Sequence, residues 1–259
     1  MPAPDVDVGL DGPVATVEIR RPPHNFFDLA LVQHLAEAFE ALDADRRCHA
    51  IVLAAQGTAF CAGAHFAPHE TRPDAQVVPP GFNPIYAHAL RLFACRKPVV
   101  AAVHGPAIGG GLGLALVADF RVVCAEARFS ANFTRLGFHP GFGLSVTLPR
   151  LVGPQQAALL FFTGRRIGGE EAQRIGLVDA LVPRDQVRTE AGRLAHEIAT
   201  SAPIAVQATR ATLRQDLLAQ IRSVIAHESE QQLAHLKTAD FREGVAAMAA
   251  RREPRFTGE

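Results

Sequence analysis

The first half of the chain alternates short apolar runs with longer amphipathic ones. Residues 14–20, VATVEIR, alternate apolar and polar positions, which predicts a strand with one buried face. Residues 29–45 place apolar side chains at helical spacing, and Asp28 stands where a helix N-cap is expected. Three other short apolar runs predict buried strands, at 50–55, 98–105 and 120–126. Strands that alternate with helices predict an α/β fold in which helices pack on a sheet.

The second half has a mostly helical pattern, interrupted by the strand-like run 177–182. Helices are expected in the amphipathic stretches 153–162, 168–176, 184–201, 203–239 and 240–259, the last of which ends in a basic tail. We therefore expect a sheet-bearing core over residues 1–195 and a C-terminal helical region over residues 196–259.

Charge and composition narrow the classes of function. The 26 basic residues balance the 26 acidic ones, so no overall field favours nucleic acid or an anionic membrane as a partner. The apolar run 98–118 approaches the length of a membrane span, but His104, Pro106 and its glycines favour a buried core segment. The first residues are acidic and lack a signal-peptide layout, and the four cysteines form no C-x-x-C motif. We expect a cytoplasmic protein with reduced thiols.

Two loops of small residues each follow a predicted buried strand. They are residues 59–65, AFCAGAH, and residues 105–113, GPAIGGGLG. Glycine lets a ligand approach backbone N–H groups closely, and the start of a helix favours negative charge. The glycine loop fits neither a dinucleotide fingerprint nor a P-loop. The two loops could together point one N–H each at a single oxygen, as in an oxyanion hole, or the glycines could serve only close helix packing.

Seven motifs, taken in order, resemble those of the enoyl-CoA hydratase/isomerase family, also called the crotonase superfamily. They are RPPHNFFD, AFCAGAHF, KPVVAAVHGPAIGGGLGLALVADF, LGFHPGFG, LPRLVG, FTGRRIGGEEAQRIGLVDALVP and DFREGVAAMAARREPRF. The resemblance spans nearly the whole chain. It implies the crotonase (ClpP-like) fold, a spiral of repeated ββα units with a C-terminal helical region that builds a homotrimer, often paired into a hexamer.

The resemblance also implies a chemistry. An acyl-CoA thioester would bind with its carbonyl oxygen between two backbone N–H groups, which stabilise the enolate formed in the reaction. These donors fall on Ala64 and on Gly110, the middle glycine of three. Losing one such donor typically costs about 3 kcal/mol of transition-state stabilisation. Coenzyme A is part of the substrate in this chemistry, and no separate cofactor is expected.

Other positions match the segments that hold coenzyme A in the family. The resemblance implies that the backbone of His24–Phe26, beside Arg20 and Arg21, binds the nucleotide end of coenzyme A. It also implies that Arg251 meets this nucleotide, often from a neighbouring subunit. It assigns the adenine and pantetheine wall to Ala62, His65 and Phe66. The three arginines could equally be solvated surface charges.

The sequence departs from the family at its carboxylates. By resemblance, the two glutamates of a hydratase fall on Gly113 and Phe133, and the isomerase carboxylate falls on Gly141. None of these residues can transfer a proton, so ordinary hydration is not expected. Loss of the carboxylates also fits two alternatives: a non-catalytic acyl-CoA carrier or sensor, and a CoA-independent β-diketone hydrolase.

Several side chains remain near the expected site. His139, in LGFHPG, is the candidate acid or base, although a structural loop histidine is the alternative. Tyr86 and His88 lie on a predicted helix that borders the acyl pocket in relatives. An apolar tunnel, favouring a fatty or aromatic acyl group, is expected from Phe82, Phe133, Phe138 and Phe142. His65 and His69 have the spacing of a metal pair beside Glu70, but Pro68 lies between them and no metal is expected.

Overall fold

A six-stranded sheet forms the centre of the computed structural model, which describes residues 5–65 and 83–259. Its strands lie in the order β1-β2-β3-β4-β6-β9, and all neighbours are parallel except β1 and β2. The strands are β1 Val6–Asp11, β2 Val14–Ile19, β3 Ala50–Ala55, β4 Val99–Val103, β6 Phe120–Val123 and β9 Ala180–Leu181. A second, three-stranded sheet has the order β5-β7-β8, with β5 Ala107–Ile108, β7 Arg128–Ser130 and β8 Ile167–Gly168. The strands expected from apolar runs are confirmed.

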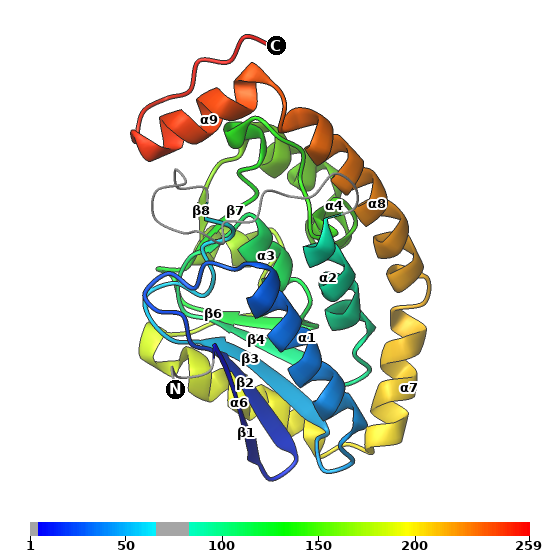
Figure 1. Cartoon of the computed structure of the whole chain (residues 1–259). Helices are drawn as coiled ribbons and strands as arrows, with labels where there is room; N and C mark the ends of the chain where they lie inside the picture. Colours follow the sequence, from blue (N-terminus) through cyan, green and yellow to red (C-terminus); the bar gives the residue numbers. More distant parts are fainter. Residues whose placement is uncertain (1–4, 66–82) are drawn as a thin grey trace.

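Helices cover both faces of the larger sheet (Figure 1). Helix α1, Leu29–Ala44, packs against α2, Pro84–Ala94, and the Asp28 side chain accepts from the Leu31 N–H at 3.0 Å as the expected cap. Helix α6, Val187–Ala199, packs on β3, β4 and β6. It spans residues 195 and 196, so the expected boundary of the core falls inside a helix that packs on the sheet.

The middle of the chain contains shorter helices. They are α3 Gly110–Ala115, the 3-10 turns η1 Thr134–Leu136 and η2 Arg184–Gln186, and α5 Gly169–Arg174. Helix α4, Leu144–Thr163, begins well before the predicted residue 153. It bends at Gly153, whose φ is 77°, between Pro149 and Pro154. Proline breaks the helical pattern in the sequence, which explains why the first half of α4 was not predicted.

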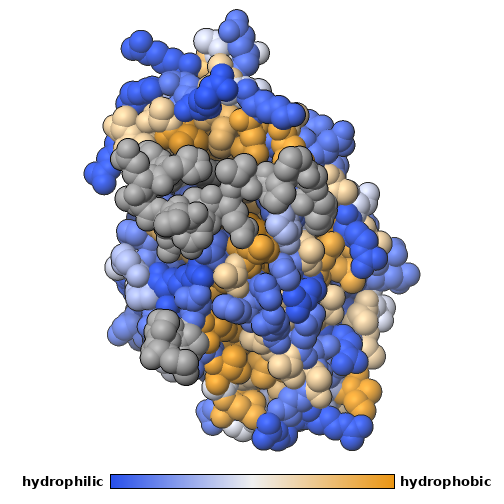
Figure 2. Space-filling model, viewed as in Figure 1, coloured by the Kyte–Doolittle hydropathy of each residue, from blue (hydrophilic) through white to orange (hydrophobic). Residues whose placement is uncertain are grey.

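Three helices form an arm along one side of the molecule (Figure 1). They are α7 Pro203–Leu213, α8 Leu217–His235 and α9 Ala239–Ala249. The single helical run predicted from residue 203 is broken at Asp216, whose φ is 64°. No residue of α7 is buried in the single chain, and Ile204 and Leu213 are 84% and 74% exposed. Figure 2 shows apolar patches among hydrophilic side chains on the face of the molecule drawn in Figure 1. No helix among the described residues is long and apolar enough to cross a membrane.

Buried charge fixes the arm to the core. Asp119, at the turn before β6, accepts from Arg210 of α7 at 2.8 Å and from Arg214 at 3.0 Å. Arg121, two residues after Asp119 and within β6, is 1% exposed. Its guanidinium donates to the carbonyls of Leu177 at 2.8 Å and of Ala118 at 2.9 Å. Each buried charge therefore has partners, as burial requires.

Candidate functional site

Three loop segments, at residues 25–27, 61–65 and 106–110, lie side by side. The Cys61 N–H donates to the Pro106 carbonyl at 3.0 Å, and the Ile108 N–H donates back to the Cys61 carbonyl at 3.0 Å. On the other side, the Phe27 N–H donates to the Gly63 carbonyl at 3.1 Å. The two loops of small residues are therefore joined backbone to backbone.

This pairing brings Ala64 close to Gly110. Gly63 has a φ of 81°, and a Cβ built there would lie 2.6 Å from the Ile108 carbonyl oxygen and 3.7 Å from the Gly110 nitrogen. Only glycine fits so close to the second loop. Among the described residues, none accepts a hydrogen bond from the Ala64 N–H or the Gly110 N–H. The two predicted donors are thus neighbours with N–H groups that remain available.

Several residues that the resemblance assigns to coenzyme A lie close to one another in the structure. The rings of His24 and Phe26 have centroids 5.5 Å apart, and those of Phe26 and His65 lie 4.6 Å apart. The Ala62 N–H donates to the His24 carbonyl at 3.0 Å. Arg251 lies on the exposed turn after α9 with a φ of 52°. Phe66, Phe82, His69 and Glu70 lie outside the described residues.

Two of the candidate arginines are paired with carboxylates. Arg20 contacts Asp7 at 2.6 Å and Glu18 at 2.8 Å. Arg21 contacts Asp28 at 2.7 Å and Asp5 at 2.5 Å. These partners neutralise the two guanidinium groups and hold the segment 20–28 against β1 and α1.

Asn25 ties the first two loops together and was missed by the sequence reasoning. It is fully buried with a φ of 51°, and its Nδ2 donates to the carbonyls of Gln56 at 2.6 Å and Ala59 at 2.7 Å. Its Oδ1 accepts from the Arg21 N–H at 3.0 Å. Asparagine tolerates the left-handed conformation better than most residues. Its residue type was therefore the one signal in the sequence that could have indicated a special backbone position at Asn25.

Phenylalanine rings cover the glycine loop. A Cβ built at Gly110 would lie 2.1 Å from the Phe27 ring, and one at Gly113 would lie 2.8 Å from the Phe142 side chain. A Cβ at Gly109 would lie 3.8 Å from the Phe133 ring. Apolar rings therefore lie against the start of α3 at Gly109, Gly110 and Gly113.

The described rings of the expected acyl tunnel form two groups. Phe133 and Phe138 have centroids 5.3 Å apart, and Phe138 also meets Phe241 of α9 at 5.5 Å. Phe142 instead contacts Phe27 at 5.8 Å and Phe93 of α2 at 6.4 Å. Phe133 of the first group lies near Gly109, and Phe142 of the second lies near Gly113.

His139 lies in the loop before α4, and its ring is close to two histidines of α8. Its Nδ1 is 2.7 Å from the Pro140 carbonyl, and its ring stands 5.8 Å from the ring of His227 and 6.5 Å from that of His235. Burial, and then the neighbouring His227 and His235, lower the pKa of His139. The imidazole is therefore neutral near pH 7. His88 instead accepts from Arg91 at 2.6 Å, and that arginine pairs with Glu40 of α1.

A polar cluster, here called the clamp, holds the loop before α4. It consists of Tyr86 of α2 with Glu228 and Gln232 of α8. The Tyr86 hydroxyl donates to Gln232 Oε1 at 2.5 Å, and Gln232 Nε2 donates to the His139 carbonyl at 2.9 Å. Burial raises the pKa of Tyr86. The phenol also occupies the space beside Gly141, where an added Cβ would lie 2.0 Å from its oxygen.

The carboxylate of the clamp binds the start of α4. Glu228 is fully buried, and its oxygens accept from the N–H groups of Gly143 at 2.8 Å and Ser145 at 3.0 Å. Burial raises the pKa of Glu228 to about 6. Sequence reasoning missed this residue because its partners lie far away along the chain. It is a cap for α4, placed where the unpaired N–H groups of a helix need an acceptor.

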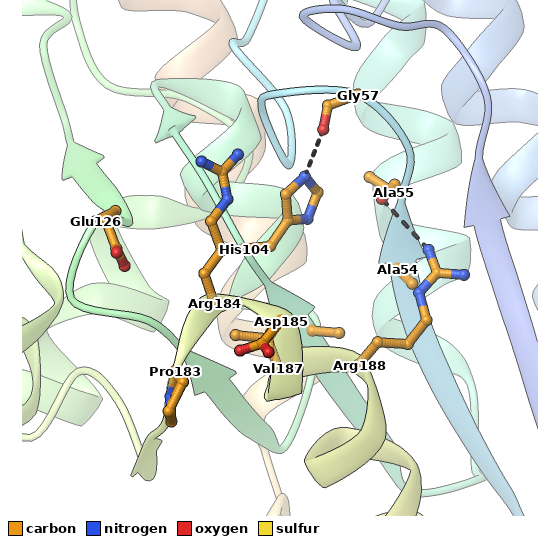
Figure 3. A pocket seen from close by; sticks show the side chains of 11 residues that line it. Ala54, Ala55, Gly57, His104, Glu126, Pro183, Arg184, Asp185, Val187 and Arg188 are labelled. Atoms are coloured by element: carbon orange, nitrogen blue, oxygen red, sulfur yellow. Dashed lines mark hydrogen bonds between the residues drawn. The ribbon is translucent and has the colours of Figure 1, made fainter.

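A cavity of about 710 Å³ lies elsewhere, at the carboxyl ends of β3 and β4 (Figure 3). Its lining mixes charges, with Arg184 and Arg188 beside Glu126 and Asp185. His104 Nε2 is 3.0 Å from the Gly57 carbonyl, and burial lowers the pKa of His104. Of the predicted site residues that the structure describes, none lines this cavity.

Comparison with known proteins identifies the family. Residues 10–259 match the model of the enoyl-CoA hydratase/isomerase family. A putative enoyl-CoA hydratase of Thermus thermophilus is 35% identical over 259 residues, covering 95% of this chain and 98% of the relative. A carnitinyl-CoA dehydratase of Salmonella arizonae is 33% identical, covering 96% of each chain.

A solved structure agrees with these relatives. The enoyl-CoA hydratase/isomerase of Pseudoalteromonas atlantica superposes with a TM-score of 0.86 at 29% identity, covering 98% of this chain and all of that one. The expected fold is therefore confirmed. The chain belongs to the enoyl-CoA hydratase/isomerase family, the crotonase superfamily, and has the crotonase fold.

Proposed function

We propose that this protein binds an acyl-CoA thioester and stabilises its enolate through the N–H groups of Ala64 and Gly110. The observation that carries the proposal is the pairing of the two small-residue loops, which leaves both N–H groups available and close together. Two such donors, fixed before the substrate arrives, stabilise the negative charge that develops on the carbonyl oxygen. Coenzyme A enters only as part of the substrate, along the wall of His24, Phe26, Ala62 and His65, with Phe66 and Arg251 as further contacts.

The reaction is not ordinary hydration. Gly113 and Phe133 stand where the resemblance expects the two glutamates, and Phe142 fills the space beside Gly113. Water addition needs groups that take and give protons, and neither residue does so. We expect hydration of crotonyl-CoA to be absent or very weak when followed by loss of the conjugated-enoyl absorbance at high protein concentration. A hydratase of the family is the positive control, and robust turnover by this protein would contradict the proposal.

His139 is the proposed acid or base, for isomerisation, decarboxylation or retro-Claisen cleavage. Because its pKa is lowered, the neutral imidazole should still accept a proton somewhat below pH 6.5. Exchange of acyl-CoA α-protons in D₂O, measured by NMR, should lose its rate as the pH falls through that lowered pKa. His139→Ala should remove most of the exchange.

The neighbour His227 provides a control for this assignment. After burial, His227 is one of the neighbours that lower the pKa of His139, so His227→Ala should move the midpoint of the pH profile upward without removing the exchange. An unchanged rate in His139→Ala would exclude His139 as the acid or base.

A non-catalytic acyl-CoA carrier or sensor is the second candidate. The enclosure of Gly110 and Gly113 by phenylalanine rings supports it, because a site without carboxylates can bind a thioester without converting it. Native mass spectrometry of protein from its source distinguishes the two: a retained and unconverted CoA ester favours the carrier. Failure to bind any CoA ester would instead favour a β-diketone hydrolase.

The proposed assembly is a homotrimer or a dimer of trimers. The exposed apolar side chains Phe162 of α4, at 78%, and Ile204 and Leu213 of α7 support it, since such surfaces are usually covered by a partner. We also propose that the protein works in the cytoplasm. The buried free thiols of its four cysteines fit a reducing compartment.

A further inference from the structure

Phe142 has an unusual backbone conformation for its size. Its φ is 63°, in the left-handed region, and the residue is 1% exposed. A bulky side chain in this conformation carries a conformational cost that the surrounding structure must offset. The ring lies directly on Gly113, since a Cβ built there would approach the Phe142 Cβ and Cδ1 to 2.8 Å.

The clamp holds Phe142 in this position from both sides. The Tyr86 oxygen interacts with the Phe142 backbone, and Gln232 binds both Tyr86 and the His139 carbonyl. On the other side, Glu228 accepts from the N–H of Gly143. The loop therefore has hydrogen bonds to two helices immediately before and after the Phe142 ring.

The ring lies where atoms beyond the thioester carbonyl would pass. Gly113 follows Gly110 by three residues on α3, so the two lie on the same face of the helix. Phe27 contacts both ends of this face, with its ring against Gly110 and 5.8 Å from the ring of Phe142. An acyl chain whose carbonyl oxygen is at Gly110 and which extends past the Phe27 ring toward Gly113 meets the Phe142 ring.

We propose that Phe142, held by the clamp, closes the acyl end of the site and restricts the protein to short acyl groups. This inference rests on the proposed function, because it takes the carbonyl oxygen to lie at Gly110. The chain length is set by a single ring rather than by the glycine helix itself. Removal of the ring leaves an apolar space bordered by Gly113, Phe27 and Phe93.

The test compares binding of saturated acyl-CoA esters, from acetyl-CoA to dodecanoyl-CoA, by titration calorimetry. Phe142→Gly removes the ring and suits the left-handed conformation, so it should bind octanoyl-CoA at least about tenfold more tightly than the original protein does. Its affinity for acetyl-CoA should change little. Phe142→Leu opens less space and should shift the preference in the same direction by a smaller amount, which keeps the test valid if the glycine variant does not fold.

Phe39 of α1 provides the matched control. It is equally buried, on α1, and is not among the nearest contacts of the glycines from 109 to 113, so Phe39→Leu should lower stability without changing the chain-length preference. Equal preferences in the original protein and both Phe142 variants would overturn the inference alone. Failure of all of them to bind any CoA ester would overturn the proposed function, and this inference with it.

Discussion

Gly110→Ala should remove most of the polarisation of a bound thioester carbonyl. The new Cβ would lie 2.1 Å from the Phe27 ring, so either the ring or the start of α3 must move. Both residues are buried. The N–H that we propose as a donor would therefore be displaced, and loss of one such donor lowers the rate by about 10²–10³.

Two measurements check this expectation. The carbonyl stretch of a bound ¹³C-labelled acyl-CoA should shift back toward its value in water, and α-proton exchange should slow by about 10²-fold. The infrared measurement applies to a carrier as well as to an enzyme. Gly192→Ala on α6 is the control, because a Cβ there meets no atom within 4 Å.

The double variant Gly110→Ala/Phe27→Ala tests the cause. Removing the Phe27 ring relieves the collision, so part of the carbonyl shift should return. An unchanged carbonyl frequency in the single variant would show that the Gly110 N–H does not bind the thioester.

Arg121→Ala should be the most destabilising substitution in the core. Arg121 is 1% exposed, and its guanidinium donates to the carbonyls of Leu177 and Ala118. It also binds Asp179 at 3.0 Å. Its removal leaves the two buried carbonyls without their donor, while the 37% exposed Asp179 keeps the backbone N–H of residue 121. The loss should lower the free energy of unfolding by about 3–5 kcal/mol.

Chemical denaturation at a fixed protein concentration measures this loss. Arg193→Ala is the control, because that side chain is 60% exposed and forms only surface ion pairs with Glu190 and Glu197. Its denaturation midpoint should hardly move. A similar small change for Arg121→Ala would mean that water replaces the lost hydrogen bonds.

The central strands and α1 could be predicted because their apolar residues repeat at the period of the element. Strand β1 could not, because most of its residues are exposed and it joins the sheet through backbone pairing with β2. The second sheet was also missed, since strands of two or three residues are too short to show a period. The run 120–126 was predicted as a buried strand, but no local pattern shows how the charge of Arg121 within it is compensated.

The backbone of the site was predictable, but its side-chain environment was not. Small residues after two strands indicated where N–H groups could be exposed, and their pairing places Ala64 beside Gly110. The clamp depends on Tyr86 and Gln232, which are 146 residues apart in the chain. Contacts at that separation are set by how α2 and α8 pack, which no local pattern reports.

Asp119, at the end of the segment that begins with the glycine loop, attaches α7 to the core. The segment that exposes its N–H groups at Gly110 finishes at this carboxylate, where Arg210 and Arg214 attach α7. Arg210 also donates to the Cys95 carbonyl at 2.6 Å, so two points of the core fix the orientation of α7. If the proposed trimer forms through α7, a subunit contact there would act on the backbone segment that leads back to the proposed donor at Gly110.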